Sequence, residues 1–137
     1  MHATLRTWKG GATPHGGTNL AIALTRPYNL EVRFVIFDTP NEQAMGLQHR
    51  QYIEAGTLFI FPGVHPGALF HSRNVREDFD LAFVGEDFTI LVKATIHPEK
   101  GVLTAPEGTV MAIESKAGEM SRWGFETGLK AYLGGWK

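Results

Sequence analysis

The residues with the clearest chemical potential lie in and around the segment ALFHSRNV, residues 68–75. If this segment is a strand, its side chains alternate between two faces, so that His71 and Arg73 project together. The guanidinium group of an arginine can hold a carboxylate or a phosphate through two parallel hydrogen bonds. This pair therefore predicts a contact site for an anionic or sugar-like ligand.

Further polar residues join this pair if the expected elements pack together. Arg50 ends a predicted helix, Asp80 begins the strand after the segment, and Glu114 ends a later strand. A general acid and base could work there if two carboxylates were close and the pKa of one were raised. The candidate ligand pocket comprises Arg50, His71, Arg73, Asn74, Asp80 and Glu114.

The same residues also have a purely structural interpretation. The side chains of Asp80 and Asn74 would form hydrogen bonds with the backbone amides of turns. Arg50 would pair with Glu114, and His71 would be exposed to solvent. Buried polar groups need partners whether or not a protein binds a ligand. Both interpretations stay open at the level of sequence.

Several classes of function are not supported by the composition. The chain has six histidines but no H-x-H or H-E-x-x-H pair, and it has no cysteine, so we expect no metal site and no thiolate chemistry. No nucleophile elbow or phosphate-binding glycine loop occurs, so we expect no cofactor. Thirteen basic and fourteen acidic residues give a net charge of −1, which does not favour nucleic acid as a partner.

Short β-type runs separated by turn signals dominate the chain after residue 28. Residues 29–37, NLEVRFVIF, alternate as a half-buried strand does, and the sequence Thr39-Pro40-Asn41-Glu42 predicts a capped helix that continues to about Arg50. A second short helix is expected over 116–123. The pattern predicts a mostly β fold: a single β-sandwich or jelly-roll-like barrel with one or two short helices.

Residues 1–28 are rich in glycine and threonine and are predicted to form an extended N-terminal arm before a single β domain, residues 29–137. The arm carries apolar residues that would be costly to leave in water, so we expect it to contact a protein surface. The candidate interface comprises Trp8, Leu20, Ile22, Leu24 and Trp136. Because the sequence shows neither a signal peptide nor an apolar stretch of about 20 residues, we expect no membrane contact and a cytoplasmic or virion-associated location.

Three motifs resemble those of the domain of unknown function 192 family. TPNEQAMGLQHR is similar to its opening helix, GTLFIFP to its G-M-L-F-x-F segment, and LFHSRNVREDFDLAFV to its F-W-M-K-N-T signature. A weaker fourth block covers 111–131. The resemblance implies a jelly-roll-like β fold and matches Gly46, Leu47, Arg50, Gly56, Leu58, Phe59, Phe70, Asn74, Asp80, Phe83, Glu114 and Gly118. The chain departs from the signature at His71, Ser72, Arg73 and Val75.

Two functions follow as hypotheses. The absence of a catalytic motif and the apolar arm favour a non-catalytic structural or interaction module that self-associates or decorates a larger assembly, for example a viral coat. The alternative is a protein that binds a small anionic or carbohydrate-like ligand, or a hydrolase, in the candidate pocket.

Overall fold

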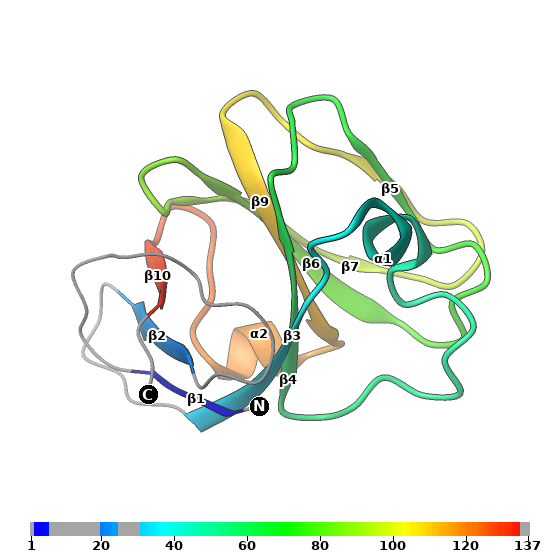
Figure 1. The fold of residues 1–137 in the computed structure, drawn as a ribbon, viewed down its shortest axis with the longest axis horizontal. Helices are drawn as coiled ribbons and strands as arrows, with labels where there is room; N and C mark the ends of the chain where they lie inside the picture. Colours follow the sequence, from blue (N-terminus) through cyan, green and yellow to red (C-terminus); the bar gives the residue numbers. More distant parts are fainter. Residues whose placement is uncertain (1, 6–19, 25–30, 135–137) are drawn as a thin grey trace.

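The structure is a computed structural model that describes residues 2–5, 20–24 and 31–134. An eight-stranded mixed sheet, called the main sheet below, has the strand order β10-β2-β1-β3-β4-β9-β6-β7, and β5 and β8 form a separate two-stranded sheet (Figure 1). The elements are β1 (His2–Leu5), β2 (Leu20–Leu24), β3 (Glu31–Ile36), α1 (Pro40–Met45), β4 (Thr57–Pro62), β5 (Leu69–His71), β6 (Phe79–Gly85), β7 (Ile90–Ile96), β8 (Val102–Thr104), β9 (Thr109–Lys116), α2 (Glu119–Arg122) and β10 (Ala131–Gly134).

The mostly β prediction with two short helices is confirmed. β3 and β4 pair in parallel because α1 lies in the connection between them, whereas β4, β9, β6 and β7 pair in antiparallel order. Within the described residues the main sheet does not close into a barrel, although a single bridge between Thr89 and Lys130 joins the segments before β7 and β10. The sandwich or jelly-roll assignment stays a prediction.

Each face of the main sheet has its own hydrophobic core, because side chains alternate along every strand. Figure 1 shows α1 and β5 on one side of the central strands and α2 on the other. The α2-side core comprises Val32, Ile36, Leu58, Ile60, Ala82, Val84, Ile90, Met111, Ile113, Met120, Trp123, Phe125 and Ala131. The α1-side core comprises Phe37, Leu47, Ile53, Phe59, Phe61, Val64, Val75, Phe79, Leu81, Phe83, Ile96, Ala105 and Ala112.

Helix α1 begins as predicted and ends earlier. The Thr39 hydroxyl accepts from the Glu42 amide, and the Glu42 carboxylate accepts from the Thr39 amide, which completes a capping box. The helix stops at Gly46, whose φ of 51° and ψ of −128° suit glycine alone. It does not reach Arg50. With no buried residue of its own, α1 is attached through Gln43, which donates to two backbone carbonyls at 2.8 Å.

The predicted strand at 68–75 is shorter in the structure, where β5 ends at His71. The buried Ser72 hydroxyl donates to the carbonyl of His97 and accepts from the Gly101 amide at 2.8 Å, so the chain turns away there. Asn74 follows with a φ of 62°. His71 and Arg73 therefore do not share a strand face, and the sequence analysis also missed β8. Helix α2 covers four residues of the predicted 116–123.

Most of the predicted arm, 1–28, lies outside the described residues, as do Trp8 and Trp136. Within the arm, β1 and β2 are strands of the main sheet, and β2 contains the backbone of Leu20, Ile22 and Leu24. The interface role of all five residues stays a prediction. Neither helix in the described part of the chain is both long and apolar enough to cross a membrane.

Candidate functional site

A cavity of about 530 Å³ lies between α1, β5 and the α1-side face of the main sheet. Its wall is largely apolar and includes Phe61, Phe70 and Phe79, whose rings belong to or pack on the α1-side core. Met45 of α1 and Leu69 of β5 also line it and are 50% and 60% exposed, so they stand at its rim. The cavity therefore offers a wet entrance and an apolar interior.

Glu114 is the acidic residue of this cavity. Strand β9 places it opposite Phe59 of β4 and Leu81 of β6, both fully buried, so its side chain belongs to the α1-side face. The residue is only 4% exposed, and burial raises the pKa of its carboxyl group to about 8. Among the described residues its carboxyl group has no hydrogen-bond or ion-pair partner. At neutral pH it is mainly a protonated acid.

Basic groups near this part of the sheet are already paired elsewhere. Lys116 follows Glu114 by two residues on the same strand face, but its ammonium lies 2.9 Å from the carboxylate of Glu77. Arg50 pairs with Glu54 at 3.0 Å, and its guanidinium carbon lies 4.8 Å from the centre of the Phe59 ring. The predicted pairing of Arg50 with Glu114 is not present.

Two histidines line the cavity near its entrance. His71 is half-buried, and its Nδ1 accepts a hydrogen bond from the Arg73 backbone amide at 3.1 Å, which places the proton of the neutral ring on Nε2. His65 is exposed. The two are six residues apart across the turn that includes Pro66 and Gly67. In the described part of the chain, no group of three or more His, Cys, Asp or Glu residues could hold a metal ion.

Of the six predicted pocket residues, the cavity brings together His71 and Glu114. Arg50 lines a separate, shallower hollow of about 410 Å³ beside α1. Arg73 is exposed and does not line the cavity. Asn74 follows Arg73 in the chain, and its side-chain amide donates a hydrogen bond to the side-chain oxygen of Gln48 at 3.2 Å.

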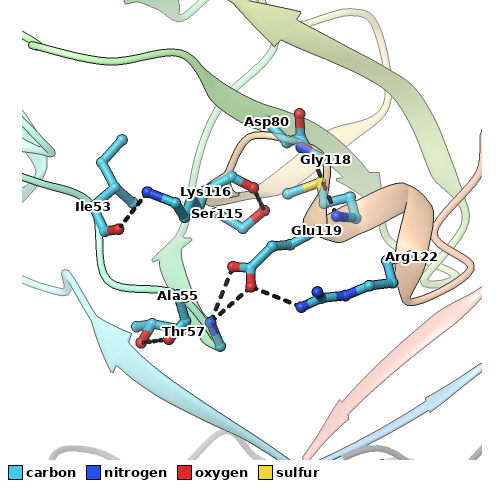
Figure 2. A network of polar contacts seen from close by, with 11 residues as sticks. Ile53, Ala55, Thr57, Asp80, Ser115, Lys116, Gly118, Glu119 and Arg122 are labelled. Atoms are coloured by element: carbon cyan, nitrogen blue, oxygen red, sulfur yellow. Dashed lines mark hydrogen bonds and ion pairs between the residues drawn. The ribbon is translucent and has the colours of Figure 1, made fainter.

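Asp80 lies on the opposite face of the main sheet and holds α2 in place (Figure 2). Its carboxylate accepts from the amides of Gly118 at 2.9 Å and Met120 at 3.2 Å, and from the hydroxyl of Thr95 at 2.9 Å. Beside it, the Glu119 carboxylate accepts from the Gly56 amide at 2.8 Å. These hydrogen bonds give both acids, Asp80 and Glu119, a structural role, and Asp80 does not line the cavity.

Sequence reasoning missed Gln43 and Gln48, which supply the amide groups of the cavity wall. Both amide hydrogens of Gln43 go to the carbonyls of Phe37 and Pro62, and Gln48 donates to the carbonyl of Ala44. The sequence could have indicated them, because Gln43 lies on the predicted capped helix and Gln48 lies just after its observed end. In the described part of the chain no lysine or arginine lines the cavity, so its chemistry suits a neutral or basic group better than an anion.

Comparisons with known proteins support the fold and do not identify a ligand. The family model DUF192, described as "Uncharacterized ACR", matches residues 23–132. A structure from Sinorhizobium meliloti, described as a "putative transcription regulator", is 15% identical, has a TM-score of 0.75, and is matched over 90% of this chain and 98% of that one. A protein of unknown function from Novosphingobium aromaticivorans is 25% identical, with a TM-score of 0.70 and coverage of 92% and 94%. No curated protein matches the chain.

Proposed function

The chain belongs to the domain of unknown function 192 family, and we propose that it is a binding protein for a small amphipathic molecule. The ligand enters the cavity beneath α1 and places its polar end at Glu114. The observation that carries this proposal is a carboxyl group that is buried, faces a cavity and lacks a hydrogen-bond partner among the described residues.

The size and lining of the cavity support this proposal. Pockets for small molecules commonly measure about 300–1,000 Å³ and combine an apolar wall with a few polar groups that orient the ligand. The cavity beneath α1 has this size, a wall of phenylalanine rings and one acid at its inner surface. Burial makes the ionised form of this acid costly, and a bound ligand would supply a partner for it.

Binding is better supported than hydrolysis. General acid and base catalysis by carboxylates needs two acids, or an acid and another base, around one reacting bond. Asp80, the second acid of the predicted pocket, lies behind the sheet with its oxygens bonded to amides of the α2 region. Among the described residues that line the cavity, Glu114 is the one carboxyl group, and the two histidines that could serve as a base, His65 and His71, stand near the entrance.

A fragment screen by ligand-observed NMR tests the proposal. Ala44 is exposed on α1 and lines the cavity, so Ala44→Trp should fill the entrance without disturbing the core. Ala55 is exposed and does not line the cavity, so Ala55→Trp is the matched control. We expect amphipathic fragments to bind the original protein and the control but not Ala44→Trp. Fragments that bind all three equally, or none, would contradict the proposal.

An assembly role through the N-terminal region remains a second proposal. One structural feature favours it: β1 and β2, the strands of the predicted arm, belong to the main sheet and so place part of the arm against the domain. In this version the protein is cytoplasmic or virion-associated and self-associates or decorates a larger particle. Light scattering on the full chain with Trp8→Ala and Trp136→Ala tests it, and an unchanged mass would argue against those two residues as the interface.

The name of the Sinorhizobium structure raises transcription regulation, which commonly involves contact with nucleic acid, as a third candidate function. At 15% identity the likeness supports the fold alone. The net charge of −1 does not favour contact with a phosphate backbone, which depends on clustered lysine and arginine. We therefore do not extend that description to this chain.

A further inference from the structure

We propose that the ligand of the cavity carries a basic nitrogen at one end of an apolar body, and that the Glu114 carboxylate is its counter-ion. This inference rests on the proposed function and adds the chemical class of the ligand. It follows from the inventory of charges and hydrogen-bonding groups that face the cavity.

The charges around the cavity disfavour an anion. Among the described residues, Glu114 is the one carboxyl group that lines the cavity, and no lysine or arginine lines it. Lys116, two residues after Glu114 on β9, is paired with Glu77, and Arg50, which lies over the Phe59 ring, is paired with Glu54. A ligand carboxylate or phosphate would have to enter an apolar site beside an acid without a fixed cation to pair with, which is strongly unfavourable.

His71 near the entrance offers an N–H donor, but two other side chains of the wall favour a donor on the ligand. Both amide hydrogens of Gln43 are already donated to backbone carbonyls, which leaves its side-chain oxygen as an acceptor. Glu114 adds two carboxylate oxygens when it is ionised. An ammonium group has three donors and no acceptor, so it complements these oxygens.

Binding of such a ligand couples to the release of a proton. The ligand enters as an ammonium ion, the O–H bond of the Glu114 carboxyl group breaks, its proton passes to the buffer, and the ammonium N–H groups donate to the carboxylate. Because burial raises the pKa of Glu114 to about 8, the acid must give up this proton at neutral pH. As the pH increases towards this pKa, the affinity should therefore rise about tenfold for each pH unit. Above the pKa the affinity should level off.

The other titratable groups around Glu114 do not replace it in this role. Strand β4 carries no titratable side chain, Asp80 of β6 faces the α2 side, and Glu42 of α1 is bonded in its capping box. Lys116 on β9 is held by Glu77. The two remaining groups that line the cavity are His65 and His71 near its entrance.

Isothermal titration calorimetry with three probes of one shape tests the inference. The probes are 4-phenylbutylamine, 4-phenylbutan-1-ol and 4-phenylbutanoate, measured against the original chain and Glu114→Gln near pH 6, 7 and 8. We expect the amine to bind at least about tenfold more tightly than the alcohol and the acid at pH 8, and Glu114→Gln to remove this preference. Buffers with different ionisation enthalpies should show release of nearly one proton per amine bound at pH 7.

The outcomes separate this inference from the proposed function. Binding of the alcohol or the acid as tightly as the amine, or binding of the amine without proton release, would overturn the amine assignment and leave a small-molecule site. Failure of all three probes to bind would overturn the proposed function. The measurement of proton release uses the original chain, so it remains decisive if Glu114→Gln does not fold.

Discussion

Asp80 and Glu114 lie on neighbouring strands of the main sheet, yet their carboxyl groups face opposite sides of it. In the register of β6 and β9, Asp80 stands opposite Ser115 and Leu81 stands opposite Glu114. An offset of one residue sends a side chain to the other face of a sheet. One acid therefore holds α2 by its backbone amides, while the other lines the cavity without a partner among the described residues.

Glu114→Gln should make the protein more stable at alkaline pH. The pKa of Glu114 is about 8 in the folded chain and 4.5 for the free side chain, so the folded state binds more protons between these values. The free energy of unfolding of the original chain must then fall as pH rises from about 4.5 to about 8. One pKa unit corresponds to about 1.4 kcal/mol. Between pH 4 and pH 9, the free energy of unfolding of the variant should therefore gain about 5 kcal/mol relative to that of the original chain.

Urea unfolding at pH 4, 7 and 9 measures this difference. Glu107 is exposed, so Glu107→Gln serves as a control whose stability should track the original chain at every pH. A constant difference between Glu114→Gln and the original chain across this range would show that the buried acid does not titrate as argued.

Asp80→Ala should loosen α2 from the sheet. The substitution leaves the amides of Gly118 and Met120 without their acceptor, and each unsatisfied buried donor costs about 1–3 kcal/mol. We expect a loss of about 3 kcal/mol in urea unfolding and faster hydrogen exchange at both amides. Asp80→Asn keeps one acceptor oxygen and should lose less. Equal stability of Asp80→Ala and the original chain would contradict the network in Figure 2.

Gly101→Ala should destabilise the fold where β8 begins. An added Cβ would overlap Cγ2 of Ile96 and lie 3.0 Å from the carbonyl oxygen of His97, so the surrounding atoms must shift. Overpacking of this kind costs about 1–3 kcal/mol. At Gly85 the nearest atom to an added Cβ is 3.4 Å away, so Gly85→Ala is the matched control and should cost clearly less. Similar losses in thermal unfolding for both variants would refute the expected crowding.

Arg73→Ala and Arg50→Ala should leave the affinity for 4-phenylbutylamine within about twofold of the original. Neither arginine lines the cavity, and Arg50 is engaged with Glu54. Titration calorimetry at pH 8 measures the affinity, with Glu114→Gln as the variant that should lose it. A tenfold loss in either arginine variant would instead favour the anion site expected from the sequence.

Local signals in the sequence predicted the elements that depend on neighbouring residues. The capping box of α1, for example, involves Thr39 and Glu42, which are three residues apart. The end of β5 was wrong because it depends on distant partners. Ser72 bonds to His97 and Gly101, which no pattern within 68–75 reveals.

The candidate site was predicted in part for the same reason. Of the residues expected in one pocket, His71 at the end of β5 and Glu114 on β9 both line the cavity. Asp80 was misplaced because its face depends on the register between β6 and β9, which strand patterns alone do not specify. The burial that raises the pKa of Glu114 arises from the packing of several elements and was equally invisible in the sequence.

The separation of the two cores has an evolutionary consequence. A substitution in a strand meets either the cavity or the packing under α2, because alternate residues belong to different faces. Relatives of this chain can therefore diverge in the layer formed by α1, β5 and β8, and so change what they bind, while inheriting an unaltered α2 layer. Residues that face the α1 side and residues that face the α2 side of one strand can therefore change independently of each other.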